Sequence, residues 1–384
     1  MSLHAELAAD LALREQRGLR RTRRLLESPQ RARVRVDGQE FVAFCSNDYL
    51  GLAADPRLVA AAKSGIDRYG VGAGASHLIL GHGTAHHELE AALAAFVRLP
   101  RALLFSTGYM ANMGSVSALA GRGDAVFADR LNHASLNDAA LVSRAAFKRY
   151  AHGDLDALEK QLKVTVARRR LVIVDAVFSM DGDIAPVPEL LALCERYDAY
   201  LLIDDAHGFG VLGAQGRGTL AHFGIESDRL IYMATLGKAA GVAGAFIAGS
   251  VALIDSLINN ARTYVYTTAA PPLLCQALLA SLALIEQEDW RRERLSEHIA
   301  ELRSGLAGLR WQLPPSQTPI QPLIVGGNAE ALALSERLAA QGLLVPAIRP
   351  PTVPQGMARL RISLSADHVA ADVARLVDAL VRAA

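Results

Sequence analysis

Residues 204–208 read Asp-Asp-Ala-His-Gly, and residues 235–241 read Thr-Leu-Gly-Lys-Ala-Ala-Gly. The first stretch follows the apolar run 200–203, and the second follows the apolar run 230–234. A short apolar run that ends in charge and glycine is typical of a strand buried in a parallel sheet. Ligands of open α/β sheets bind just beyond the carboxyl ends of such strands. The two stretches therefore predict a parallel sheet with a ligand site at one edge.

Three side chains of these stretches suit one cofactor, pyridoxal phosphate (PLP). Lys238 lies in a loop of small residues with no carboxylate beside it in the sequence. Desolvation in such a loop would lower the pKa of the amine and make it a better nucleophile. Asp204 would pair with the pyridinium nitrogen, with His207 nearby, and Lys238 would form the Schiff base. Singly, a strand-end aspartate is most often a cap and a lysine is most often solvated, but their combination favours the cofactor.

The composition bounds the class of protein. The chain has 384 residues, enough for two or three domains, with 51% hydrophobic and 21% charged residues as in globular proteins. Its net charge of +1 gives no global field that would attract nucleic acid or an anionic membrane. Cys45, Cys194 and Cys275 form no C-x-x-C pair and fit a reducing compartment. The uncharged stretches 239–254 and 264–285 are broken by glycine or proline, so we expect a soluble, cytoplasmic protein.

The chain order predicts one large and one small α/β unit. Leucines and arginines across 1–27 predict an amphipathic helix with a basic face, and Asp37-Gly38 predicts a hairpin. Alternation of helical stretches with apolar runs predicts a mainly parallel sheet covered on both faces. A long helix across 272–300 would be the hinge. The expected strands are 102–105, 125–128, 171–174, 200–203, 230–234 and 245–248, followed by 321–325 and 360–363. The expected division is 1–45 (part of the small domain), 46–285 (large cofactor domain) and 286–384 (small domain).

The glycine-rich stretch 70–83 carries histidines but fits neither a dinucleotide loop nor a metal site. No strand precedes it, so we expect a close-packed backbone segment. Ala91 stands where an H-E-x-x-H motif beginning at His87 would need its second histidine. We therefore expect no metal.

Further polar side chains follow the predicted strands. Residues 106–112 open a helix whose N–H groups would cradle the phosphate, and Thr235 adds a hydroxyl. His133 would lie flat on the cofactor ring, while Ser179 and His207 would donate to its phenolate oxygen. Arginines 349 and 361 suit a bidentate grip on a carboxylate.

Four motifs carry a family resemblance: 46–51 (Ser-Asn-Asp-Tyr-Leu-Gly), 178–182 (Phe-Ser-Met-Asp-Gly), 204–208 and 235–238. They resemble the α-oxoamine synthases, PLP enzymes of the aspartate-aminotransferase fold (fold type I), over nearly the whole chain. The resemblance implies an α/β fold with a mainly parallel central sheet plus a smaller α/β domain. It also implies a homodimer with shared active sites. Leu236 and the pair Ala239-Ala240 depart from the family, which often carries an aromatic residue and glycine there.

The resemblance assigns roles to individual residues. The implied catalytic residues are Lys238, His133, Asp204 and His207. The implied cofactor-binding residues are Gly108, Tyr109, His133, Ser179, Asp204, His207, Thr235 and Lys238, with Thr267 and Thr268 from a second subunit. The implied substrate-binding residues are Arg21, Asn47, His133, Arg349, Thr352 and Arg361, and either Arg349 or Arg361 would hold the amino-acid carboxylate.

Residues 72–77 and 347–354 are similar to the members that condense L-alanine with a pimeloyl thioester in biotin biosynthesis. In that reaction Lys238 would remove the alanine α-proton, and carbon dioxide and the free thiol carrier would leave. The thioester could be carried by CoA or by a carrier protein. One alternative is a sister synthase that uses glycine or serine with another acyl-CoA, which residues 347–354 disfavour. A cofactor-free α/β binding protein is disfavoured by the combination of Lys238, Asp204 and His207.

Overall fold

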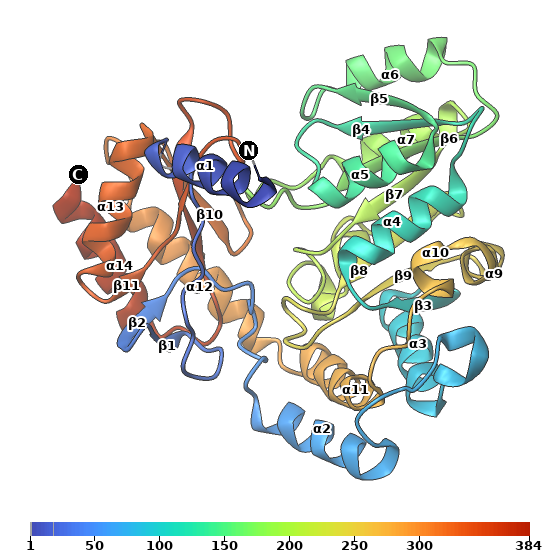
Figure 1. The fold of residues 1–384 in the computed structure, drawn as a ribbon, viewed down its shortest axis with the longest axis horizontal. Coiled ribbons are helices and arrows are strands. Elements are labelled where there is room, and N and C mark those ends of the chain that lie inside the picture. Colours follow the sequence, from blue (N-terminus) through green and yellow to red (C-terminus); the bar gives the residue numbers. More distant parts are fainter. Residues whose placement is uncertain (1, 18) are drawn as a thin grey trace.

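A seven-stranded sheet organises the larger part of the computed structural model, which describes residues 2–17 and 19–384 (Figure 1). The strand order is β3-β9-β8-β7-β6-β4-β5; β9 is antiparallel to both of its neighbours, and the other pairs are parallel. The predicted fold class and all six predicted strands of this sheet are confirmed. The strands are β3 (Arg101–Phe105), β4 (Ala125–Asp129), β5 (Ala146–Tyr150), β6 (Arg170–Asp175), β7 (Tyr200–Asp204), β8 (Leu230–Thr235) and β9 (Ala245–Gly249).

Both faces of this sheet are buried. Neighbouring β7 residues Leu202 and Ile203 belong to two separate apolar clusters, one on each face. Burial on both faces is why the central strands read as continuous apolar runs. Edge strand β5 was missed because its sequence Ala-Phe-Lys-Arg-Tyr is half exposed and has no such run. The surrounding helices are α2 (Pro56–Tyr69), α3 (Thr84–Val97), α4 (Gly108–Leu119), α5 (Ala134–Ser143), α6 (Leu155–Val164), α7 (Val187–Arg196), α8 (Thr219–Phe223), α9 (Val251–Asn260), α10 (Arg262–Val265) and α11 (Pro272–Gln287).

Two three-stranded sheets form the smaller part, on the other side of the molecule in Figure 1. The predicted hairpin is confirmed: Asp37 and Gly38 both have positive φ, 50° and 79°, as its tight turn requires. The hairpin pairs in parallel with β11, so the first and last parts of the chain share a sheet. The division at residues 45 and 285 stays a prediction. The elements are β1 (Arg33–Val36), β2 (Gln39–Ala43), β10 (Ile320–Gly326), β11 (Leu343–Leu344), β12 (Ala347–Ile348), β13 (Ala358–Ser363), α12 (Trp290–Gly305), α13 (Asn328–Ala339) and α14 (Ala370–Ala383).

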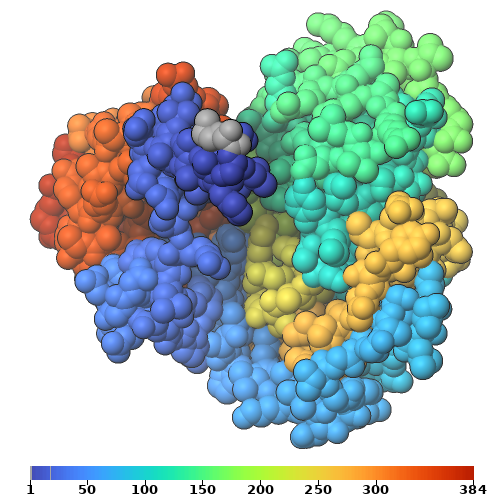
Figure 2. All heavy atoms as spheres, in the orientation of Figure 1, coloured from blue at the N-terminus to red at the C-terminus, as the bar shows by residue number. Residues whose placement is uncertain are grey.

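The predicted amphipathic helix over 1–27 is wrong in length and in character. Helix α1 (Leu3–Gln16) ends at Gln16 and buries none of its residues; residues 1 and 18 lie outside the described part. Leucine and alanine are spread around its whole circumference, so no apolar stripe forms. Figure 2 shows the N-terminal segment lying over the C-terminal part on this face.

The predicted hinge helix over 272–300 is two helices, α11 and α12. Glu288 leaves the helical conformation, with φ −104° and ψ 66°, and its carboxylate accepts hydrogen bonds from Arg57 (2.6 Å) and Arg291 (2.8 Å). These ion pairs stabilise the non-helical conformation of Glu288 between α11 and α12.

The close-packed backbone predicted for the glycine-rich stretch is confirmed at Gly81 and wrong at Gly70, Gly72 and Gly74, while Gly83 makes only an ordinary contact at 3.9 Å. A Cβ on Gly81 would lie 2.1 Å from the carbonyl oxygen of Ala75, whereas Gly70, Gly72 and Gly74 have open space around them. Gly70 and Gly74 have φ of +74°, so backbone conformation explains those two glycines. Within the described residues, the longest helices are too short or too polar to cross a membrane.

Candidate active site

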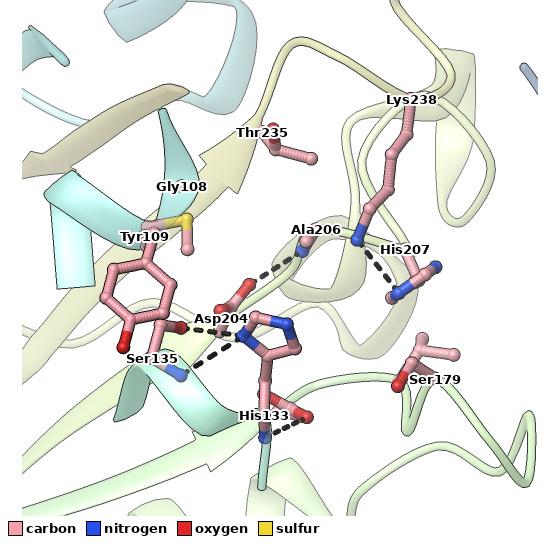
Figure 3. Close-up of a pocket in the computed structure, with 13 residues that line it drawn as sticks. Gly108, Tyr109, His133, Ser135, Ser179, Asp204, Ala206, His207, Thr235 and Lys238 are labelled. Carbon is pink, nitrogen blue, oxygen red and sulfur yellow. Dashed lines mark hydrogen bonds between the residues drawn. The ribbon is translucent and has the colours of Figure 1, made fainter. Parts of the chain in front are cut away.

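A cavity of about 190 Å³ lies at the carboxyl edge of the large sheet (Figure 3). Strand ends of β6, β7 and β8 and the first residues of α4 and α5 surround it. The structure brings all eight cofactor residues predicted from one chain into this cavity. Its lining is Gly108, Tyr109, His133, Ser135, Asp175, Val177, Ser179, Asp204, Ala206, His207, Met233, Thr235 and Lys238.

The buried carboxylate of Asp204 ends β7 and faces the cavity. Its oxygens accept hydrogen bonds from the Asn112 side chain at 2.7 Å and from the Ala206 N–H at 3.1 Å. Among the described residues, no lysine, arginine or histidine forms an ion pair with it. A buried carboxylate without a direct ion pair is costly, so this site suits a ligand that brings a positive charge into contact with it. A protonated pyridine nitrogen fits that requirement.

Lys238 approaches the same space from the loop after β8. Its Nζ lies 2.8 Å from Nε2 of His207. Burial lowers the pKa of the amine from 10.5 to about 8, and the charges of Asp204 and Asp175 oppose only part of that shift. The desolvation expected from the sequence is therefore confirmed. A lysine with this pKa is about one-tenth neutral at pH 7, far more than an ordinary lysine, and the neutral amine is the form that acts as a nucleophile or base.

This pKa predicts a pH dependence of stability in the cofactor-free protein. Because Lys238 binds its proton less tightly when folded, the unfolded chain holds more protons between about pH 8 and 10.5. Stability should therefore rise with pH across that window. Chemical denaturation at a series of pH values gives the free energy of unfolding of the wild type and of Lys238→Met. Between about pH 8 and 10.5 this free energy should rise less steeply with pH in the variant. Parallel slopes would contradict the lowered pKa.

A chain of hydrogen bonds orients His207, the residue that contacts the Lys238 amine. The Lys238 amine donates to Nε2 of His207, so the Nδ1–H of His207 donates to the Tyr49 oxygen at 2.7 Å. The Tyr49 hydroxyl then donates to Oδ1 of Asn47 at 3.1 Å, which also lies 3.4 Å from Arg361. Burial and the charge of Lys238 hold the pKa of His207 well below its usual value, so the ring is neutral. The predicted substrate residues Asn47 and Arg361 are thereby linked to the lysine.

Tyr49→Phe tests this chain. The ring volume stays, but the buried Nδ1–H of His207 loses its acceptor, which costs about 1–3 kcal/mol. We expect kcat to fall about tenfold because the base loses its fixed orientation. Steady-state kinetics with a thermal melt of each protein gives the comparison. An unchanged kcat would show that Tyr49 serves packing alone.

The first turn of α4 offers the site for an anion. Thr107 caps the helix by accepting the Met110 N–H at 3.1 Å, which leaves the N–H groups of Gly108 and Tyr109 toward the cavity. A Cβ on Gly108 would lie 3.8 Å from Oγ1 of Thr235, so Gly108 and Thr235 are neighbours at this corner of the cavity. The Tyr109 hydroxyl donates to the Asp138 carboxylate, which fixes the direction of the tyrosine ring.

Asp175 was missed by sequence reasoning. It ends β6 in register with Asp204 of β7, and its Oδ2 accepts the His133 N–H at 2.9 Å. Burial, followed by the charge of Asp204, raises the pKa of Asp175 well above its usual value. Its hydrogen bond therefore places the predicted stacking residue His133 at the cavity. An aspartate directly after the apolar run 171–174 was the available signal.

The remaining predicted residues fall into three places. Arg361 is buried beside the cavity, where its guanidinium donates to the Ser179 carbonyl at 2.6 Å. Arg21, Arg349 and Thr352 line a separate groove of about 700 Å³ between α1 and the 347–352 segment. The threonines at 267 and 268 are not among the cavity-lining residues of this chain. Arg361 thus lies beside the cavity and Arg349 lies in the separate groove, whereas the sequence left both as candidates for binding the amino-acid carboxylate.

The family is decided by a match across the chain. The model described as aminotransferase class I and II matches residues 39–380. The chain belongs to this family. Within the aminotransferase class I and II family, it is 66% identical over 379 residues to an 8-amino-7-oxononanoate synthase from Nitrosomonas europaea, covering 98% of each chain. This similarity confirms the family resemblance drawn from the motifs.

Solved structures of this aminotransferase family share the fold. A structure of SPT (serine palmitoyltransferase) with PLP as an internal aldimine has a TM-score of 0.93 and 28% identity, covering 100% of this chain and 98% of that one. The 8-amino-7-oxononanoate synthase from Francisella tularensis has a TM-score of 0.78 and 30% identity, covering 89% and 97%. The predicted fold type is confirmed by both.

Proposed function

We propose that this chain catalyses the PLP-dependent condensation of L-alanine with a pimeloyl thioester. The products are 8-amino-7-oxononanoate, carbon dioxide and the free thiol carrier, and the reaction belongs to biotin biosynthesis. The observation that carries the proposal is one cavity that is lined by both a desolvated lysine and a buried carboxylate that has no direct ion pair. The 66% identical relative from Nitrosomonas europaea supports the choice of substrates within the family.

The cavity residues fit PLP in a definite orientation. Asp204 would pair with the ring nitrogen, and Lys238 would bond the aldehyde carbon. The first turn of α4 and Thr235 would hold the phosphate. Ser179 and His207 would contact the ring oxygen, and His133 would lie against the ring face. When bound, PLP supplies an electron sink for the negative charge that develops on the α-carbon of the substrate.

The protein's own groups then move and place the proton. The Lys238 amine takes the alanine α-proton, and its hydrogen bond to His207 fixes the direction of approach. Asp204 would keep a bound ring nitrogen positive, and the Asn112 side chain and the Ala206 N–H hold the Asp204 carboxylate in place. Arg361 grips the alanine carboxylate, beside the Asn47 side chain.

The groove formed by Arg21, Arg349 and Thr352 receives the acyl thioester. Its arginines suit the anionic groups of a thiol carrier. Residues 267 and 268 of a second copy of the chain would complete the phosphate site, so we propose that the active form is a homodimer. We also propose a cytoplasmic location. Light scattering of the purified protein measures the oligomeric state, and a monomer with full activity would contradict the shared site.

A substrate panel tests the proposed reaction. Release of carbon dioxide and free thiol should be fastest with L-alanine and pimeloyl-CoA or pimeloyl-carrier protein. Glycine with acetyl-CoA and serine with palmitoyl-CoA are the comparison arms. Faster turnover in either comparison arm would assign the chain to a sister synthase, and no turnover in any arm would refute the proposal.

A further inference from the structure

The loop that carries Ser179 into the cavity is a tight hairpin over 178–183. The Phe178 N–H donates to the Asp183 carbonyl at 3.0 Å, and the Gly182 N–H donates back to the Phe178 carbonyl at 2.8 Å. Gly182 has φ of +72°, which this turn needs. These bonds shape the hairpin, but they do not fix its position relative to the rest of the cavity.

Strand β13 of the smaller part holds the hairpin from one side. Arg359, only 2% exposed, donates to the Met180 carbonyl at 3.1 Å and to the Asp181 carboxylate at 2.5 Å. Arg361, two residues along the same strand, donates to the Ser179 carbonyl at 2.6 Å. The same strand therefore holds both the Ser179 loop and the arginine proposed for the substrate carboxylate.

His152 holds the hairpin from the other side. Its Nε2 donates to Asp183 at 3.0 Å, and its Nδ1 donates to Asp129 at 3.2 Å. The ring also packs edge-on against Phe178, with centroids 4.4 Å apart. Hydrogen bonds to the two carboxylates raise the pKa of His152 to about 10, so the bridge is charged at neutral pH.

We propose that Asp181 and Asp183 are positioning residues for the amino-acid substrate. Through Arg359 and His152 they fix the 178–183 hairpin, and the hairpin fixes both the Ser179 side chain at the cofactor oxygen and the carbonyl that orients Arg361. The inference rests on the proposed function, since Ser179 and Arg361 have these ligands only in that reaction. Neither aspartate lines the cavity itself.

Two isosteric variants and one matched control test the inference in the holoenzyme. Asp181→Asn and Asp183→Asn keep the side-chain shape and remove one anchoring charge each. Asp124→Asn does the same to a carboxylate that binds Arg168 at 2.9 Å, just before β4 at the opposite edge of the sheet. The measurements are the thermal melt, the pH titration of the visible cofactor absorbance, and KM for alanine and for the pimeloyl thioester.

We expect each hairpin variant to raise KM for alanine about tenfold, to shift the pH titration of the cofactor band, and to leave KM for the thioester unchanged. The control should lower the melting temperature without moving the other readouts. Arg359→Gln should raise KM for alanine, whereas Arg359→Lys, which keeps the charge, should retain most of the wild-type affinity for alanine. Hairpin variants that behave like the control would overturn the inference alone. A wild type without a cofactor band or alanine turnover would instead refute the proposed function and the inference with it.

Discussion

Lys238→Ala is expected to lower kcat by at least about 10⁴-fold, because the variant loses both the group that bonds the cofactor and the base that takes the α-proton. Lys238 is the half-buried lysine that lines the cavity, whereas Lys63, Lys160 and Lys163 are exposed on helices. Steady-state assays of thiol release with alanine and the pimeloyl thioester measure the effect.

Lys163→Ala is the matched control, since it removes an exposed lysine of α6 that does not line the cavity. It should retain wild-type kcat and the yellow colour of the bound cofactor. Full activity in the Lys238 variant, or a comparable loss in the Lys163 variant, would contradict the assignment of Lys238 as the catalytic lysine.

Asp204→Asn is expected to lower kcat by about 10²–10³-fold. The amide keeps the side-chain size but loses the negative charge, and a carboxylate near a titrating cation shifts its pKa by about 1–3 units. Without that charge the ring nitrogen would lose its proton near neutral pH and accept less electron density. The pH dependence of the visible cofactor spectrum should move in the same variant.

Asp205→Asn is the control that distinguishes an effect of the Asp204 charge on the cofactor from a loss of stability. The Asp205 carboxylate is also buried, but it accepts hydrogen bonds from Thr219 and Tyr232 and does not line the cavity. We expect this variant to lose stability while changing kcat far less than Asp204→Asn. Equal losses of kcat would mean that position 204 acts through folding rather than through the cofactor.

The sequence allowed the large sheet and the cofactor edge to be predicted because both leave local signals. Strands buried on two faces read as apolar runs, and parallel strands bring their carboxyl ends to one edge. Lys238, Asp204 and His207 each follow such a run within a few residues. The local sequence pattern was therefore enough to predict most of the residues that line the cavity.

The supporting contacts could not be predicted because they join distant parts of the chain. Tyr49 meets His207 across 158 positions, and Asn112 meets Asp204 across 92. The choice between Arg361 and Arg349 likewise depends on how the smaller part of the protein sits against the sheet. In the same way, the break between α11 and α12 depends on ion pairs of Glu288 with a distant arginine, Arg57.

Borohydride reduction of the yellow protein, followed by peptide mapping, tests the central claim most directly. The reaction fixes the cofactor to whichever lysine bonds its aldehyde. We predict a pyridoxyl group on the peptide that contains Lys238 and on no other lysine peptide. A label on Lys148 or on an exposed lysine such as Lys63, or no label at all, would contradict the account.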